Sequence, residues 1–295
     1  MKDIYPLAGI TKQGFHKSLN REIRIIEEQE QLLPEVKKLR EKHDKLACRT
    51  MYNILKPTTM GRDKFEQYCF SHGYRVVYAK SWYVKTTDST GVIRFENLIL
   101  LMDQLTGVNQ LWVSDITYYH LGSKVYYITL IMDIYNREIV GHSLSDSLST
   151  VSTSLAAIKM AVKYRKLPKG DSSIVFHTDG GGQYYSSVFL KYTSEYGFKN
   201  SMCYTPYENP HAERLNGTIK NDYLYPKDPK NYSDLQKLLT KSVNLYNRER
   251  PHDSLGKISP SEFLKMVNDG LLTKIWVINK KKKVTKKEKV NIIIN

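Results

Sequence analysis

The chain has 295 residues, of which 41% are hydrophobic, an ordinary share for a globular protein with room for two domains. Its 45 Lys and Arg exceed its 30 Asp and Glu, and the resulting net charge of +15 favours polyanionic partners such as nucleic acid. No apolar run reaches the roughly 18 residues of a membrane helix, and the N-terminus lacks a secretion signal. Three widely spaced cysteines argue against a disulfide framework. We therefore expect a cytoplasmic protein with no membrane role.

Residues 1–75 are expected to form a helical domain. Apolar residues recur at helical spacing over 32–39, and Pro34 suits the first turn of that helix. Two further short helices are expected at 50–55 and 62–72. Three short helices rich in Lys and Arg fit either a DNA-binding helix-turn-helix unit or a small bundle without a DNA role. Spacing alone favours neither interpretation.

A larger domain is expected over residues 111–270, after a linker at 76–110. Its first part predicts an antiparallel meander of three strands, because β-branched and aromatic residues dominate it. Helices and two further short strands then alternate. The strands are expected at 111–120, 125–134, 138–143, 173–177 and 199–202, and the helices at 150–164, 186–196, 212–224, 232–246 and 261–268. This order is typical of an α/β ribonuclease-H-like core, a mixed five-stranded sheet with flanking helices.

The C-terminal tail, residues 271–295, is strongly basic. Its segment from Lys280 to Val290 holds seven Lys and one Glu. Such a run is usually solvated and disordered. We expect a disordered tail that can still contact phosphate groups.

Three carboxylates stand where the predicted fold can bring them together. Asp115 lies in the middle of the first strand, where Asp is disfavoured. Asp179 follows the fourth strand and precedes three glycines, which allow a sharp bend and a close approach by a ligand. Glu213 lies near the start of a helix, behind Pro210. Each residue taken alone has a structural explanation, such as an edge-strand charge, a turn or a favourable helix dipole.

Together the three carboxylates predict a metal site. The expected strand order places the first and fourth strands side by side, with the helix that carries Glu213 across them. A cluster of carboxylates repels itself without a cation, and hard oxygen ligands suit Mg²⁺ or Mn²⁺. Two such ions about 4 Å apart can activate an attacking oxygen and stabilise a leaving one in phosphoryl transfer.

Several further residues are candidates for DNA contact. Asn216 and Lys220 follow Glu213 by about one and two helical turns, so they share its face, and a Lys there can hold a phosphate. The alternative for Lys220 is an ordinary solvated side chain. Phosphate binding is also expected of three residues in the segment YNRERPH, for which helix-dipole complementarity is the alternative; these are Arg248, Arg250 and His252.

Other residues near these candidates can be interpreted either as part of the site or as structural residues. His177 shares a strand face with Asp179, so it either flanks the metal site or packs within the sheet. Tyr184, after the glycines, either contacts substrate or packs. Asp133 and Arg137 flank a strand end, and we interpret them as structural residues that can form an ion pair.

Four segments carry a resemblance to a known family: LWVSDITYY, HTDGGGQY, ENPHAERLNGTIKNDYL and YNRERPHDSLGKISPSEF. In this order they resemble successive blocks of bacterial insertion-sequence transposases, the group whose second reading frame encodes a retroviral-integrase-like core. CRTMYNILKP resembles that family's helix-turn-helix segment. The resemblance implies that Asp115, Asp179 and Glu213 are the catalytic DDE triad, and that Lys220 is the basic residue associated with it.

The resemblance also implies an activity and partners. The activity is Mg²⁺-dependent nicking of double-stranded DNA at an element's terminal repeats, followed by strand transfer to target DNA by the freed 3′-hydroxyl. The partners are DNA, further copies of the chain, and an upstream-frame protein as fusion or partner. Two alternatives remain: a catalytically inactive DNA-binding repressor and a ribonuclease-H-like nuclease without a joining step.

The spacing of the second and third carboxylates departs from the family. Asp179 and Glu213 are separated by 33 residues, slightly fewer than the family usually has. The shortening falls in the loop 203–211, and loops tolerate such changes. Glu208 is the other nearby glutamate, but it precedes Pro210 and lies outside the helix. Glu213 is therefore the preferred third carboxylate.

Overall fold

The structure is a computed structural model of the 295-residue chain, and it describes residues 5, 9–78, 94–170, 172–204 and 208–278. The chain forms two compact units, Met1–Ala79 and Lys80–Asn295. Across the described ranges, none of the helices combines the length and the apolar character that a membrane span requires.

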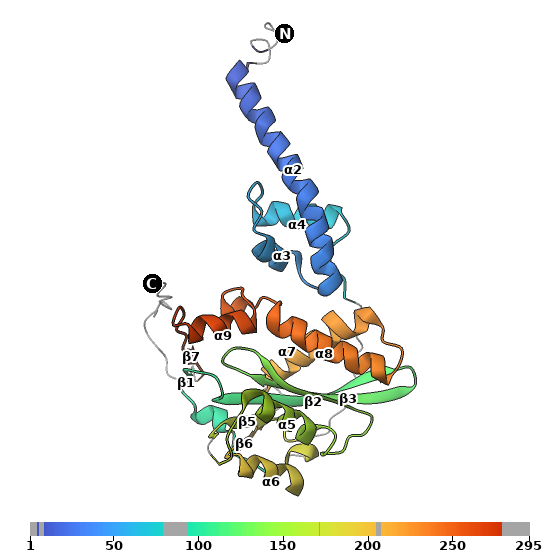
Figure 1. Cartoon of the computed structure of the whole chain (residues 1–295), viewed down its shortest axis with the longest axis vertical. Coiled ribbons are helices and arrows are strands. Elements are labelled where there is room, and N and C mark those ends of the chain that lie inside the picture. The colour runs from blue at the N-terminus through green and yellow to red at the C-terminus, as the bar shows by residue number, and fades with distance from the viewer. Residues whose placement is uncertain (1–4, 6–8, 79–93, 171, 205–207, 279–295) are drawn as a thin grey trace. The chain divides into compact units, whose positions relative to one another are not determined.

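The first unit contains a long helix and two short ones (Figure 1). Glu28 of the long helix accepts hydrogen bonds from the backbone N–H groups of Thr58 (2.6 Å) and Thr59 (2.8 Å), which fixes the loop between the short helices. These bonds lower the pKa of Glu28 to about 2, against the opposing effect of burial. The helices are α2 (Lys12–Lys42), α3 (Cys48–Leu55) and α4 (Arg62–Ser71), and their shared core includes Val36, Met51, Phe65 and Cys69. The two short helices expected at 50–55 and 62–72 are confirmed.

The prediction for Pro34 is wrong. Helix α2 begins at Lys12, so Pro34 lies inside it and not in its first turn. Thr11 caps the helix, since its side chain accepts a hydrogen bond of 3.0 Å from the N–H of Gly14. The intervening residues are mostly good helix formers, and the helix continues through the proline although one backbone hydrogen bond is lost.

The second unit is built on a mixed five-stranded sheet. Its strand order is β4-β3-β2-β5-β6, in which β2 pairs antiparallel with β3 and parallel with β5. The predicted meander and the neighbouring positions of the first and fourth strands are therefore confirmed. The strands are β2 (Leu111–Leu121), β3 (Lys124–Asp133), β4 (Ile139–Ser145), β5 (Val175–Thr178) and β6 (Lys199–Met202).

Helices cover both faces of this sheet (Figure 1). Trp112 and Ile131 point into the apolar core shared with α5 and α6, while Val113 and Leu130 point into the core shared with α7, α8 and α9. This alternation along β2 and β3 is the period-two pattern of a sheet buried on both sides. The helices are α5 (Ser154–Arg165), α6 (Ser187–Glu195), α7 (Pro210–Thr218), α8 (Tyr232–Arg248) and α9 (Pro260–Asn268).

Ordered elements extend beyond the predicted limits of 111 and 270. Strand β1 (Gln104–Leu105) pairs with β7 (Trp276–Val277), so part of the predicted linker and part of the predicted tail meet in a small sheet. A 3-10 turn at Leu98–Leu101 packs on the core, and the N–H of Leu98 donates to Ser201 Oγ at 2.9 Å. The basic segment 280–290, for which disorder is expected, lies outside the described residues.

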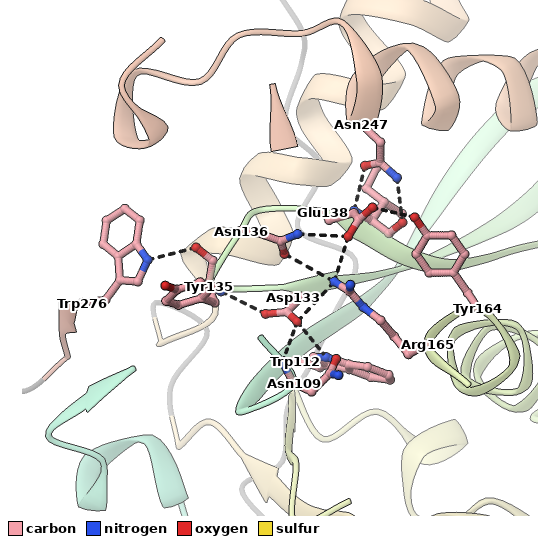
Figure 2. Close-up of polar contacts among 11 residues, drawn as sticks. Asn109, Trp112, Asp133, Tyr135, Asn136, Glu138, Tyr164, Arg165, Asn247 and Trp276 are labelled. Carbon is pink, nitrogen blue, oxygen red and sulfur yellow. Dashed lines mark hydrogen bonds and ion pairs between the residues drawn. The ribbon is translucent and has the colours of Figure 1, made fainter. Parts of the chain in front are cut away.

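A buried ionic network closes the turn between β3 and β4 (Figure 2). Arg165 of α5 pairs with Glu138 at 2.8 Å and with Asp133 at 3.4 Å, and both carboxylates are buried. Burial raises the pKa of Asp133 to about 6 despite the opposing effect of Arg165. The ion partner of Asp133 is thus Arg165, whereas Arg137 contacts His211 and Trp276.

Candidate active site

Strand register aligns the first two candidate carboxylates. Strands β2 and β5 run parallel, with Val113 opposite His177. Asp179 lies just past the end of β5, and the same register extended by two residues would bring it beside Asp115, since neighbouring strands lie about 4.8 Å apart. Alternate residues of a strand point to the same face of the sheet, and by this rule both aspartates belong to the face that α7 covers. Residues 64 positions apart are neighbours in space because β5 is inserted beside β2.

The glycine after Asp179 is required by the local geometry. Gly180 has a φ of +80°, in the left-handed region that favours glycine. A Cβ atom there would lie 2.4 Å from the terminal carbon of Met202. Asp179 Oδ1 accepts a hydrogen bond of 3.0 Å from the N–H of Gly181, which holds the carboxylate at the end of β5.

The two aspartates influence each other electrostatically. Burial raises the pKa of Asp115 to about 7, and the charges of Asp179 and, more weakly, Glu213 add to that effect. Burial also raises the pKa of Asp179. Burial and the negative neighbours together outweigh the attraction between Asp115 and the nearby ammonium group of Lys220. The donor set therefore fits a divalent cation, which would supply the missing charge.

Helix α7 and the π-helical segment after it (Ile219–Leu224) are fastened along β2 by three side chains. Asn209 Nδ2 donates to the backbone carbonyl of Ser114 (3.0 Å), and Asn216 Nδ2 donates to Asp115 Oδ2 (2.9 Å). Lys220 Nζ donates to Thr117 Oγ1 at 2.7 Å. Asn216 and Lys220 thus both face β2, whereas the expectation that they share this face with Glu213 stays a prediction. The predicted single helix over 212–224 changes from α to π at residue 219.

Glu213 lies between these anchoring residues. It is four residues after Asn209 and three before Asn216, so the helix directs it toward the same side. Its side chain is exposed, and its backbone N–H bonds to the carbonyl of Asn209 at 3.3 Å. Within the described part of the chain, no group of three His, Cys, Asp or Glu residues is already arranged to hold a metal ion.

Glu208, the alternative third carboxylate, forms structural hydrogen bonds. Its Oε2 accepts hydrogen bonds from Asn97 Nδ2 (2.7 Å) and from the backbone N–H of Tyr204 (2.8 Å). These bonds tie the segment before β1 to the end of the sheet. The shortened loop includes residues 205–207, which lie outside the described residues.

Three of the five predicted DNA contacts have partners within the protein. Asn216 and Lys220 bind β2, and Arg250 pairs with Asp222 at 2.8 Å. His252 is half-buried with its ring 4.8 Å from that of Tyr246, and burial, with nearby arginines, lowers its pKa to about 3. Arg248 is exposed at the C-terminal end of α8.

Two open alternatives are decided in favour of packing. His177 is fully buried, with its Nδ1 atom 2.9 Å from Ser201 Oγ, and burial lowers its pKa to about 4. Tyr184 is also buried, and its hydroxyl lies 2.9 Å from Ser114 Oγ. The sequence reasoning missed Asn209, although an Asn directly before Pro210 is a recognisable helix start.

Comparison with known proteins identifies this region. Residues 106–207 and 196–260 match two family models, each described as an integrase core domain. The transposase for insertion sequence element IS629 of Shigella sonnei is 32% identical over 156 residues, which cover 52% of this chain and 51% of that protein. A putative transposase for IS986/IS6110 of Mycobacterium tuberculosis is 30% identical over 159 residues, covering 52% and 57%.

A solved structure of the HTLV-2 integrase catalytic core domain in complex with magnesium covers 52% of this chain and 95% of its own, with 21% identity and a TM-score of 0.43. The chain spans between half and three fifths of the length of the insertion-sequence relatives, as in a 31 kDa protein of element IS600 of Shigella sonnei, 31% identical and covered to 58%. The mixed sheet and the matches over residues 106–260 together show that this part of the chain is an integrase core domain with the ribonuclease-H-like arrangement of strands.

Proposed function

We propose that this chain is a DNA transposase in which Asp115, Asp179 and Glu213 hold divalent metal ions for the cleavage and joining of DNA. The observation that supports the proposal is the parallel pairing of β2 with β5, in which Val113 lies opposite His177. Extended by two residues, this register would bring Asp115 beside Asp179, and Asn216 of the helix that bears Glu213 bonds to Asp115. The relatives named as transposases of insertion elements support the same activity.

The side chains have separable roles in this proposal. Asp115 and Asp179 provide the two oxygen donors on the sheet, and Glu213 provides the third from α7. Bound Mg²⁺ or Mn²⁺, as two ions, would activate the attacking oxygen and stabilise the leaving one. Asn216 orients Asp115 through its hydrogen bond, as a group next to a metal ligand commonly does.

The reaction has two phosphoryl transfers. In the first, a water oxygen attacks the phosphate at an element end, the P–O3′ bond breaks, and a free 3′-hydroxyl is released. In the second, that hydroxyl attacks a phosphodiester of the target DNA, the P–O3′ bond of the target strand breaks, and the new P–O bond joins the element end to the target while the target 3′-hydroxyl leaves. Both ends of an element must be held at once, which favours a multimer of this chain on double-stranded DNA.

The test is incubation of the full chain with labelled element ends and Mg²⁺, with nicked and joined products scored separately. We expect Asp115→Asn, Asp179→Asn and Glu213→Gln each to abolish both products while DNA binding remains. Glu195→Gln is the matched control, because Glu195 is an exposed carboxylate on α6 that pairs only with Lys169 at the surface. Full activity in any triad variant would refute the proposed mechanism.

Two alternative functions give different results in this assay. A repressor would bind the element ends and produce neither product with Mg²⁺ or Mn²⁺. A nuclease without a joining step would produce nicks alone.

A further inference from the structure

Positive side chains from three separate segments gather beside the first turn of α7. Arg137 follows β3, Arg214 lies on α7, and Lys274 precedes β7. The Nη1 atom of Arg137 lies 3.0 Å from Nδ1 of His211, and its guanidinium carbon lies 4.8 Å from the ring centre of Trp276. Lys274 Nζ lies 4.0 Å from the same ring. Two cations therefore share one indole ring.

The cluster is not neutralised from within the protein. Two buried carboxylates of this unit already have cationic partners, since Asp133 pairs with Arg165 and Asp222 with Arg250. Among residues 94–170, 172–204 and 208–278, Arg137, Arg214 and Lys274 have no carboxylate within ion-pair distance. Arg214 lies three residues after His211 on α7, so the two side chains share one side of the helix. Uncompensated positive charge of this kind attracts an anion.

The cluster is also held in place. Trp276 Nε1 donates a hydrogen bond of 2.9 Å to the carbonyl of Tyr135, and Trp276 pairs with Leu105 in the small sheet (Figure 2). Arg137 adopts a φ of +60°, an uncommon conformation for a residue other than glycine. Such strain concentrates at binding sites, where the surrounding structure fixes a side chain for a ligand.

We propose that Arg137, Arg214 and Lys274 form a phosphate-binding site that holds the DNA backbone beside helix α7. The proposal rests on the proposed function, because DNA is the ligand. Arg214 directly follows Glu213, and adjacent helix residues project in different directions, so the bound phosphate lies on the flank of the helix that carries the third candidate metal ligand. We assign the phosphate contact to these residues and not to Arg250, because the Arg250 guanidinium already forms an ion pair with Asp222.

The test is the salt dependence of binding between the full chain and a fluorescently labelled DNA duplex. The variant is Arg214→Ala, because Arg214 is exposed and its truncation removes no hydrogen bond to the rest of the described structure. One lost phosphate contact reduces the slope of log affinity against log salt by about 0.9, which weakens binding roughly fivefold near 0.15 M salt. Adding Lys274→Met should roughly double the change in slope.

Two controls make the result specific. Lys191→Ala removes one exposed positive charge from α6, on the other face of the sheet, and we expect it to keep the wild-type slope. Arg214→Lys retains the charge and should also keep the slope.

Three outcomes would overturn the site. An unchanged slope in Arg214→Ala, with normal wild-type binding, refutes this site but not the transposase. Failure of the wild type to bind any duplex refutes both proposals. In the third outcome, the slope for Arg214→Ala is unchanged, but inorganic phosphate raises the melting temperature of the wild type and not that of Arg214→Ala. The site then binds a free anion or an acidic partner instead of DNA.

Discussion

Arg165→Met should strongly destabilise the second unit. Arg165 is 10% exposed and is the shared cation of two carboxylates, Asp133 at 0% and Glu138 at 2% exposure. Removing one partner from a buried ion pair costs about 3–5 kcal/mol. We expect a loss near the lower limit, about 3 kcal/mol, because Asp133 keeps hydrogen bonds from the N–H groups of Asn109 (2.7 Å) and Tyr135 (3.0 Å).

The loss should depend on pH. The pKa of Asp133 in the folded protein, about 6, lies above its ordinary value of 3.8, so acid protonates the folded state first. Protonation removes the unpaired charge that the substitution creates. Because Arg165 lowers this pKa, its loss raises the pKa further, so the deficit of Arg165→Met should be largest at high pH and shrink as the pH falls toward about 6.

Urea unfolding monitored by circular dichroism at several pH values measures this effect. A loss of about 3 kcal/mol also lowers the Tm by roughly 6–12 °C for a unit of this size. Lys163→Met is the matched control, because Lys163 is an exposed residue of the same helix, outside the ionic network. A loss below about 1 kcal/mol, or one that is equal at low and high pH, would refute the reasoning.

Two further predictions concern the carboxylates. Asn216→Ala removes the hydrogen bond to Asp115, and cleavage should fall about 10–100-fold with DNA affinity unchanged; an unaltered rate would show that Asn216 does not position Asp115. Asp115→Asn should stabilise the metal-free protein at about pH 8 by up to about 4 kcal/mol. The pKa of Asp115, about 7 when folded, is raised by burial and by Asp179. That gain should vanish below about pH 4, and thermal melts with and without Mg²⁺ should show stabilisation by the ion in the wild type alone.

The sequence predicts the long strands of the five-stranded sheet well, but it does not predict the short strands that pack beside the core. The strands that became β2 and β3 have long β-branched and aromatic runs, so their pattern survives in any context. Strands β1 and β7 have two residues each, too few for any periodicity, and they form only because distant segments meet. For the same reason the linker and the tail could not be assigned to the core from local pattern.

In the candidate site, too, features that follow from the order of elements were predicted, whereas contacts between distant side chains were not. The alignment of Asp115 with Asp179 follows from strand order, which the element sequence indicates. The partner of Arg250 could not be foreseen, because Asp222 reaches it from a π-helical segment that a regular helical projection does not describe. Charge in the motif YNRERPH suggested a DNA contact, whereas the fold uses one of its arginines to join two buried segments.

Helix α7 determines how the three carboxylates can come together. Asn209 and Asn216 fix its backbone to β2 on both sides of Glu213, so movement of the helix would break two hydrogen bonds near a buried strand. The Glu213 side chain is exposed and free to change rotamer, at a cost below about 2 kcal/mol. A cation attracted by Asp115 and Asp179 offsets that cost, because it compensates for the burial and the repulsion that raise the pKa of Asp115. We infer that rotation of the Glu213 side chain completes the triad. The backbone of α7 stays fixed during this rotation, because Asn209 and Asn216 hold it on both sides of Glu213.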